Sequence, residues 1–412
     1  MQKYIRVNFI LSLLTCAIPI SLVVGAAVLE FCIFISCLLF FYINWKKLGL
    51  NYYKNNFSIT FFVFCLFLIF GSLTSDYVSN SIRNSIFYFR FGILTLIIWY
   101  LLDYCKNFKF FFFVSLAATL SVLILYSFFQ LFILQNQLNN TRISGIFGTE
   151  SVQGSFLLRI VPIFIILYYY NKKYLNKSFH YLFYSILILS FSLIILSGER
   201  AAIFLTFLGF FLLFIFFKMS LKKIFFFSML ILSTFYLTIF FNPPSKERIF
   251  IETYQQLLQA NSAEKKIYIF SEGHQHHFTT ALIIFKNYYI KGVGVRNFRM
   301  ECRKDIYKKV GTYYCTTHPH NTYMQLLSET GLVGLLFVMS FLIFIFKQVY
   351  KFLLNVYIKQ NKVHEPLGFA LIIIIINFFP FITTGSFFNN WLSALYFLPI
   401  GFLLHELNYK KN

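Results

Sequence analysis

Long uninterrupted apolar runs are the feature that most constrains what this chain can fold into. Runs at residues 57–74, 110–134 and 366–384 approach or exceed the ~20 residues that cross a bilayer as a helix. They do not alternate between apolar and polar residues, as strands of a membrane barrel do. Since 58% of the 412 residues are hydrophobic and only 12% are charged, the sequence predicts an all-α, polytopic membrane protein.

The runs predict about twelve transmembrane helices. Residues 8–42 are too long for one helix and too long for the apolar region of a signal peptide, so a break near residues 25–30 is expected to give two spans. Ten further spans are expected at residues 57–74, 85–102, 110–134, 152–170, 181–196, 201–217, 224–241, 331–346, 366–384 and 390–405.

Loop charges orient these helices. With the N-terminus in the cytoplasm, alternate turns carry the lysines and the short turns on the other side carry none; examples are Lys46, Lys106, Lys172, Lys222 and Lys347. This positive-inside pattern predicts a multi-pass protein of the bacterial inner membrane with both termini cytoplasmic. The formal charge of +22 is therefore explained by the lysines that orient the protein in the membrane, and no nucleic-acid partner is expected.

The same pattern divides the chain into three parts. Residues 1–241 are expected to hold helices one to nine, and residues 323–412 helices ten to twelve. Residues 242–322 are expected to form one long extracytoplasmic loop that contains the catalytic region.

Arginines, by contrast, mark the outer half of the predicted bundle. Apart from the long loop, its basic residues are Arg83, Arg90, Arg142, Arg159 and Arg200. Arg159 is expected roughly 10 Å below the outer surface, where a charge usually faces a cavity or a partner. Neutralisation by Glu150 and Glu199 or snorkelling to the interface is the alternative, but two carboxylates are too few for all these arginines. Because guanidinium groups bind phosphate in a bidentate way, an outward-facing phosphate-binding cavity is predicted.

The stretch from Cys315 to Gly334 joins the long polar segment to an apolar run. Pro319 suits the first turn of a helix, so His320 and Asn321 are expected within that turn. The positive end of a helix favours neutral imidazole and attracts anions. His320 is therefore a candidate general base, and a capping histidine without chemistry is the alternative.

Two of the seven cysteines, Cys302 and Cys315, fall in the long loop. Since the extracytoplasmic side permits disulfides, these two are expected to pair. The loop also holds Gly273-His-Gln-His-His-Phe278, and zinc is the metal that its histidines could bind together with His318 and His320. No carboxylate or cysteine completes a familiar ligand spacing, so neither a metal nor a cofactor is predicted.

Four motifs resemble the O-antigen ligase family of bacterial inner-membrane glycosyltransferases. His320-Asn321 followed by Gly331-Leu-Val-Gly334 is similar to that family's signature. Further similarities are Gly292-Val-Gly-Val-Arg-Asn-Phe298, Ser197-Gly-Glu-Arg200 and Arg142-Ile-Ser-Gly-Ile-Phe-Gly148.

The resemblance implies metal-independent transfer of a glycan from undecaprenyl diphosphate onto a lipid A–core or other acceptor hydroxyl. It implies that His320 is the base, supported by His318, Asn321, Gly331 and Gly334. The diphosphate would be held by the arginine that matches Arg200. The family's loop arginine is replaced by His274 in this sequence; the other expected diphosphate ligands are Arg142, Arg159 and Arg296, with Arg248 as a further substitute.

Two alternative functions stay open at this level. A polymerase of lipid-linked repeat units would use the same donor with a glycan as acceptor. A transporter of anionic lipids would use the arginine cavity without catalysis. The histidine signature favours transfer over transport.

Overall fold

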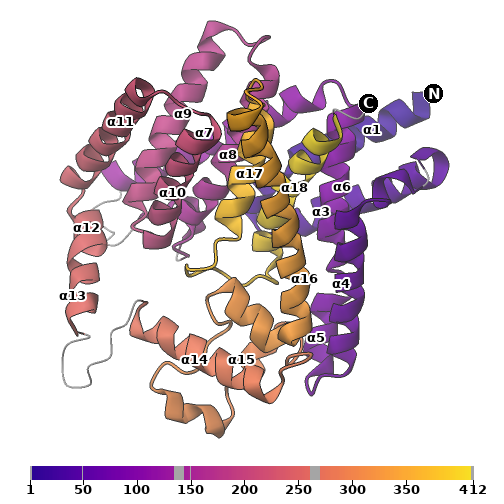
Figure 1. Cartoon of the computed structure of the whole chain (residues 1–412), viewed down its shortest axis with the longest axis vertical. Helices are drawn as coiled ribbons and strands as arrows, with labels where there is room; N and C mark the ends of the chain where they lie inside the picture. The colour runs from indigo at the N-terminus through magenta and orange to yellow at the C-terminus, as the bar shows by residue number, and fades with distance from the viewer. Residues whose placement is uncertain (1, 49, 134–142, 149, 260–269, 410–412) are drawn as a thin grey trace.

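The computed structural model describes residues 2–48, 50–133, 143–148, 150–259 and 270–409, and these form a bundle of helices with no strand among them (Figure 1). The predicted all-α fold is confirmed. The expected ligand Arg142 lies outside the described residues.

The first half of the bundle follows the apolar runs. Its helices are α1 (Gln2–Cys16), α2 (Ile18–Val24), α3 (Ala26–Ile43), α4 (Asn56–Leu73), α5 (Val78–Ser85), α6 (Phe89–Tyr104), α7 (Phe108–Phe132), α8 (Gln153–Asn171), α9 (Lys177–Leu196), α10 (Arg200–Phe216) and α11 (Leu221–Phe240). Four helices of the polar segment follow, α12 (Pro243–Lys246), α13 (Glu252–Gln259), α14 (Glu272–Asn287) and α15 (Phe298–Glu301). The chain ends with α16 (Thr322–Leu353), α17 (Glu365–Asn377) and α18 (Asn390–Tyr409).

Eight helices in the described residues are long and apolar enough to cross a membrane, and a ninth span exists if the bent pair α1 and α2 counts as one. The bend between these two helices is 41°. It precedes Pro19 at the start of α2, where proline is compatible with a helix only in the first turn. The predicted count of twelve spans is not confirmed, although every expected run is largely helical.

The expected span at 366–384 is the clearest difference. Helix α17 ends at Asn377, three residues before Pro380, because proline lacks an N–H donor and disfavours helical backbone in the residue before it. Residues 378–389 instead form an irregular connection to α18. This connection runs to the beginning of α16, where it contacts the candidate site.

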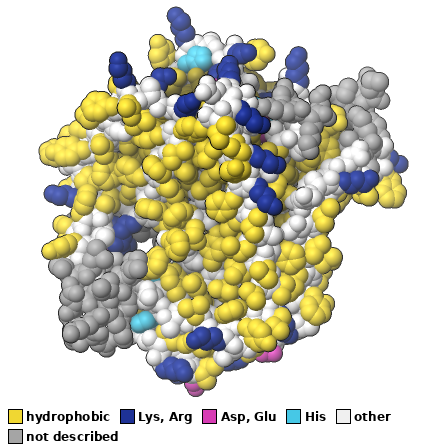
Figure 2. Space-filling model, in the orientation of Figure 1, with side chains coloured by type: hydrophobic (Ala, Val, Ile, Leu, Met, Phe, Trp, Pro, Cys, Tyr) yellow, Lys and Arg dark blue, Asp and Glu magenta, His cyan; other side chains and the backbone are white. Residues whose placement is uncertain are grey.

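Burial separates central from peripheral helices. In α6 every residue from Phe91 to Leu102 is buried, and α17 is buried almost throughout. In α11 only Ile239 is buried. Figure 2 shows an apolar band across the middle of the visible face, with lysines and arginines both above and below it. This distribution is that of a bundle surrounded by lipid.

The long polar segment is folded rather than extended. Helices α14 and α15 lie at the bottom of Figure 1, where α16 begins. A small core supports them, formed by the buried side chains of Ala281, Ile284, Val293, Phe298, Cys302 and Tyr307. A disulfide joins Cys302 to Cys315, as predicted. It fixes the end of α15 to the residues that lead into His318.

Candidate functional site

The beginning of α16 is set by Asn321. Its side chain accepts hydrogen bonds from the backbone N–H groups of Tyr323 at 2.9 Å and Met324 at 3.1 Å, which makes it the N-cap. The helix therefore begins at Thr322. The expectation that His320 and Asn321 lie in the first turn is wrong, because the asparagine side chain supplies the cap and ends the preceding loop.

His320 stands immediately before this cap in a left-handed backbone conformation, with φ of 56°. Its carbonyl oxygen accepts from the backbone N–H of Thr384 at 2.8 Å. The neighbouring Asn321 Nδ2 donates to the carbonyl oxygens of Pro380 at 2.8 Å and Ile382 at 2.9 Å. The connection between α17 and α18 thus holds the histidine in a conformation that costs a non-glycine residue about 1–3 kcal/mol.

Three imidazoles surround that of His320. The ring centroid of His318 lies 4.1 Å from it, that of His274 lies 5.2 Å away, and that of His277 lies 5.3 Å away. The last two project from the first turns of α14. We call His274, His277, His318 and His320 the histidine cluster. Among the residues that the structure describes, no group of histidine, cysteine or acidic side chains has the geometry of a metal site.

The cluster is electrically neutral at neutral pH. Burial, followed by the charge of His320, lowers the pKa of His318 to about 3 and that of His277 to about 4. Burial, then His320, then Arg200 and Arg248 lower the pKa of His274 to about 4. Burial alone lowers the pKa of His320. The sequence predicted a neutral His320 imidazole because the N-terminus of a helix carries positive charge. In the structure, desolvation is what lowers its pKa.

Nitrogen atoms of the cluster differ in their partners. Nδ1 of His274 lies 2.6 Å from Ser271 Oγ, and Nδ1 of His318 lies 2.9 Å from Thr317 Oγ1. Nδ1 of His277 is buried without a hydrogen-bond partner among the described residues, whereas the ring of His318 interacts with the backbone of Thr384. Buried polar atoms without partners are uncommon in folded proteins. The His277 nitrogen is therefore available to a ligand.

Arg200 and Arg248 provide the positive charge beside His274. Arg200 is the first residue of α10, and its Nη1 donates to Thr253 Oγ1 at 2.9 Å and to Gln256 Oε1 at 2.8 Å. Arg248 forms an ion pair with Glu252. The segment that carries α13 therefore contacts the start of α10.

Arg159 lies deeper, within α8, and is only 3% exposed. Its Nη1 donates to the Ser155 carbonyl oxygen at 2.8 Å, and its Nε has no hydrogen-bond partner among the described residues. Its guanidinium carbon lies 5.7 Å from the centroid of the Tyr396 ring. The hydroxyl of Tyr396 is 3.3 Å from Thr322 Oγ1. Tyr396 therefore connects Arg159 to the first residue of α16.

Glu199 ties the two arginine-bearing helices together. Its carboxylate accepts from the backbone N–H groups of Gly154 at 2.6 Å and Ser155 at 3.1 Å, and from Ser155 Oγ at 2.6 Å. The carboxylate thus binds the N-terminus of α8, which favours negative charge. This contact fixes Arg159 and Arg200 relative to one another.

Arg296 has a different environment. Its Nη1 donates to Asn84 Oδ1 at 2.9 Å, and its backbone N–H donates to Glu329 Oε2 at 2.8 Å. The predicted ligand is thus engaged with α5 and α16. Arg299, which the sequence analysis did not consider, instead contributes to the lowered pKa of His318.

The loop that contains Gly292 and Gly294 forms backbone hydrogen bonds with α16 just before Gly331. The backbone N–H groups of Val293 and Gly294 donate to the carbonyl oxygens of Ser328 and Glu329 at 3.0 and 2.9 Å. Gly331, with φ of 64°, interrupts the helical backbone of α16, and a Cβ there would collide with the backbone of Ile290. Because Gly331 has no Cβ, the backbone at Ile290 can approach α16 closely. The glycine serves this contact and not packing against another membrane helix. Gly334 instead faces the Thr330 side chain within its own helix.

Glu329 is a functional candidate that sequence reasoning missed. This carboxylate is 1% exposed and accepts hydrogen bonds from the backbone N–H groups of Arg296 and Phe298 and from Gln325 Nε2. The available signal was a single acidic residue beside an apolar run, where a charge is costly and rarely without a role. Glu329 fixes the Gly292–Phe298 loop against α16.

One protein-family model matches part of the chain. Residues 185–339, which run from α9 into α16, match the family described as O-antigen ligase. The match confirms the resemblance that the motifs predict. It implies a glycosyltransferase-like enzyme that acts on lipid-linked glycans in a membrane. No curated protein matches the chain.

Proposed function

We propose that this O-antigen ligase-like chain transfers a glycan from undecaprenyl diphosphate to an acceptor hydroxyl, such as one of lipid A–core. The reaction would occur without a metal at the outer face of the bacterial inner membrane, with both chain termini in the cytoplasm. One observation carries the proposal. A neutral histidine cluster lies beside Arg200 and Arg248, at the end of an apolar helix long enough to span a bilayer.

The reaction needs a base and a means of stabilising the leaving group. The acceptor oxygen attacks the anomeric carbon while its proton passes to the imidazole of His320. The bond from the anomeric carbon to the diphosphate oxygen breaks, and the diphosphate departs with the electron pair. A single displacement of this kind inverts the anomeric configuration. Arginine side chains in a site shielded from water stabilise the charge that develops on the diphosphate.

His320 is the base that the geometry supports best. It is the member of the cluster around which the other three imidazoles lie. A general base works best when its pKa lies near the working pH. The pKa values of about 3 to 4 at His274, His277 and His318 make those three poor bases. They are better suited to orienting the acceptor by hydrogen bonds.

Arg200 and Arg159 are the proposed diphosphate ligands, with Arg248 in place of the family's loop arginine. Arg200 lies at the outer start of α10, and the Nε of Arg159 is buried without a partner among the described residues. His274, neutral because of its lowered pKa, can donate one N–H to a phosphate oxygen but adds no charge. Arg296 is proposed as a positioning residue, because its described hydrogen bonds go to Asn84 and Glu329.

The same chemistry fits a polymerase, in which the acceptor hydroxyl belongs to another lipid-linked glycan. Transport without catalysis is the weaker alternative, because it leaves the histidine cluster without a role. Deleting the gene and analysing the surface glycan separates these functions. A ligase predicts lipid A–core without polymer while long lipid-linked polymer accumulates. Single repeat units would indicate a polymerase, and an unchanged glycan would overturn the proposal.

A further inference from the structure

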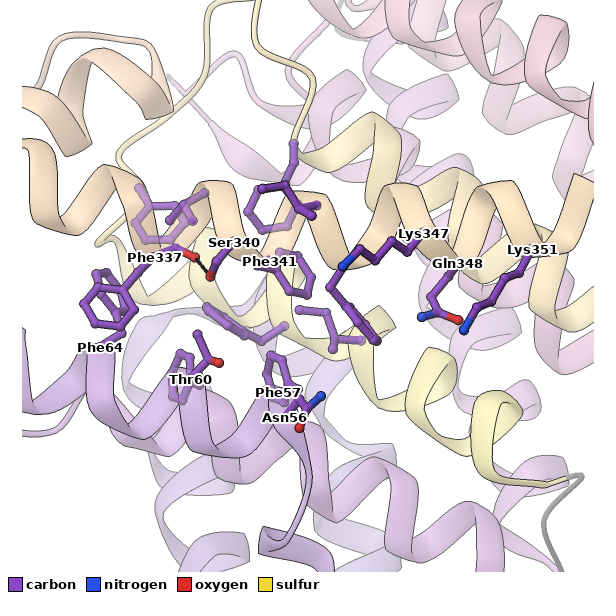
Figure 3. A pocket seen from close by; sticks show the side chains of 18 residues that line it. Asn56, Phe57, Thr60, Phe64, Phe337, Ser340, Phe341, Lys347, Gln348 and Lys351 are labelled. Carbon is purple, nitrogen blue, oxygen red and sulfur yellow. Dashed lines mark hydrogen bonds between the residues drawn. The ribbon is translucent and has the colours of Figure 1, made fainter.

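A groove between α4 and α16 forms a second candidate site (Figure 3). It encloses about 490 Å³, within the range of roughly 300–1,000 Å³ that is usual for small-molecule pockets. Its walls are mainly aromatic and include Phe57, Phe64, Phe337 and Phe341. Buried residues of the α17–α18 region, such as Phe397, form its floor. An apolar chain is the ligand that such walls accommodate.

One end of the groove is cationic. Lys347, Gln348 and Lys351 project from α16 and lie together in Figure 3. The two lysines are four residues apart, so they share a helix face and repel one another. Both are exposed, and neither forms a salt bridge within the described part of the chain. An anionic group between them would relieve this repulsion.

This cationic end is remote from the histidine cluster. Lys347 lies 16 residues beyond Gly331, where the helical backbone of α16 is interrupted. This corresponds to roughly 24 Å along the helix at 1.5 Å per residue, and the hydrocarbon core of a bilayer is about 30 Å thick. A phosphate held by Lys347 therefore lies toward the other end of α16 from His320. It is not the diphosphate of a donor bound at the cluster.

We propose that the groove binds one anionic phospholipid from the lysine-rich side of the membrane. The phosphate binds Lys347 and Lys351, Gln348 donates to the headgroup, and an acyl chain lies along the phenylalanines of α4 and α16. Lysine is a common phosphate ligand when it acts as a point charge, and basic residues at a membrane boundary attract anionic lipids. The presence of a lipid site does not depend on the proposed glycan transfer, but the choice of a phospholipid over a polyprenyl chain rests on it.

A polyprenyl chain is the rival occupant, since it too is apolar and long. It gives no reason for two unpaired lysines at the end of the groove, because its own diphosphate would lie at the histidine cluster. Charge complementarity therefore favours the phospholipid. The two occupants differ in mass and in dependence on the lysines.

Native mass spectrometry of the detergent-solubilised full chain tests the proposal, with dioleoyl phosphatidylglycerol and dioleoyl phosphatidylcholine as probes. The wild-type protein should retain one phosphatidylglycerol in preference to phosphatidylcholine. The Lys347→Ala/Lys351→Ala variant should bind it at least about tenfold more weakly, because two attractions to the phosphate are lost. Lys222→Ala/Lys223→Ala, which changes two exposed lysines of α11, is the matched control and should bind normally.

A second pair of variants removes the cavity without changing charge. Ser340→Phe places a ring in the groove and should displace the lipid, whereas Met339→Phe on the adjacent exposed position should not. Equal binding by wild-type protein, the lysine variant and Ser340→Phe would identify a non-specific lipid and overturn the proposal. A retained polyprenyl species, unaffected by the lysine substitutions, would overturn it equally.

Discussion

The imidazole rings of His318 and His320 lie with their centroids 4.1 Å apart, on either side of Pro319. Two imidazolium groups at this distance would repel one another, so protonation of one ring opposes protonation of the other. The positive φ of His320 accompanies this close approach. The pair is therefore electrically coupled, and a substitution at either position changes the environment of the other.

Acid should destabilise the protein through the histidine cluster. In the folded state the pKa values of His274 and His277 are about 4 and that of His318 about 3, against 6.5 for an ordinary histidine. The unfolded chain therefore binds more protons between pH 6.5 and pH 4, so the free energy of unfolding falls as the pH falls through that window. Thermal unfolding of purified protein at pH 7.5 and pH 5 measures this loss.

His277→Gln should reduce the acid sensitivity, because it removes one buried group that must remain neutral. His276→Gln is the matched control, since that ring stacks on Tyr313 outside the cluster. If acidification lowers the unfolding temperature of wild type and of His277→Gln by the same amount, this interpretation is contradicted.

Arg200→Lys should lower the rate of transfer by at least about tenfold, because lysine cannot reproduce a bidentate contact with phosphate. The loss should be seen in assays with a synthetic lipid diphosphate donor, and Arg159→Lys should behave similarly. Arg83→Lys changes an exposed arginine of α5 and should leave the rate unchanged. Near-normal transfer by Arg200→Lys would mean that the site requires only a charge there, or nothing.

Gly331→Ala should destabilise the protein by about 1–3 kcal/mol or more, since alanine must adopt a left-handed conformation. Its Cβ would also meet the Ile290 carbonyl. Gly71→Ala, in α4, is the control, because the nearest atom to its added Cβ is 3.9 Å away. Similar unfolding temperatures for the two variants would show that the contact between Gly331 and the Ile290 segment contributes little to stability.

Reporter fusions test the membrane orientation. Fusions within residues 245–315 should report the outer side, and fusions within 347–365 the cytoplasm, as the lysine distribution predicts. A cytoplasmic signal from the long segment would contradict both the proposed sidedness and the division of the chain at residues 242 and 322.

Much of this architecture follows from local sequence properties. Apolar runs specify helices because a bilayer leaves few other ways to satisfy the backbone. The pairing of Cys302 with Cys315 was predicted because both lie in the same polar segment, and the structure confirms it. The break near Gly25 was likewise expected, and α3 begins at Ala26.

Contacts between distant segments were not predictable in the same way. The support of His320 by residues 380–384 depends on α17 ending at Asn377. Pro380 is a local signal for that ending, but the docking of the following residues beside α16 is not encoded locally. Glu329 and Arg299 gain their roles only when the segment around Phe298 docks on α16. Asn321 was expected within the first turn because Pro319 suits that turn, but its side chain caps the helix instead.

The assignment of His320 as the base requires a variant that preserves its backbone. Asparagine tolerates the left-handed conformation better than other non-glycine residues, so His320→Asn removes the imidazole with little backbone strain. His318→Asn is the comparison, because its ring lies beside His320 but its pKa of about 3 makes it a poor base. Binding of the donor by both variants should remain measurable and would show that they are folded.

The most direct test of the account is the rate of glycan transfer by purified His320→Asn protein, with a synthetic lipid diphosphate donor and a chelator in the buffer. The account predicts a loss of at least about a hundredfold relative to wild type, in keeping with general-base contributions. It also predicts a smaller loss in His318→Asn and full wild-type activity in the chelator. Wild-type rates in His320→Asn would contradict the base assignment, and loss of wild-type activity in the chelator would contradict metal independence.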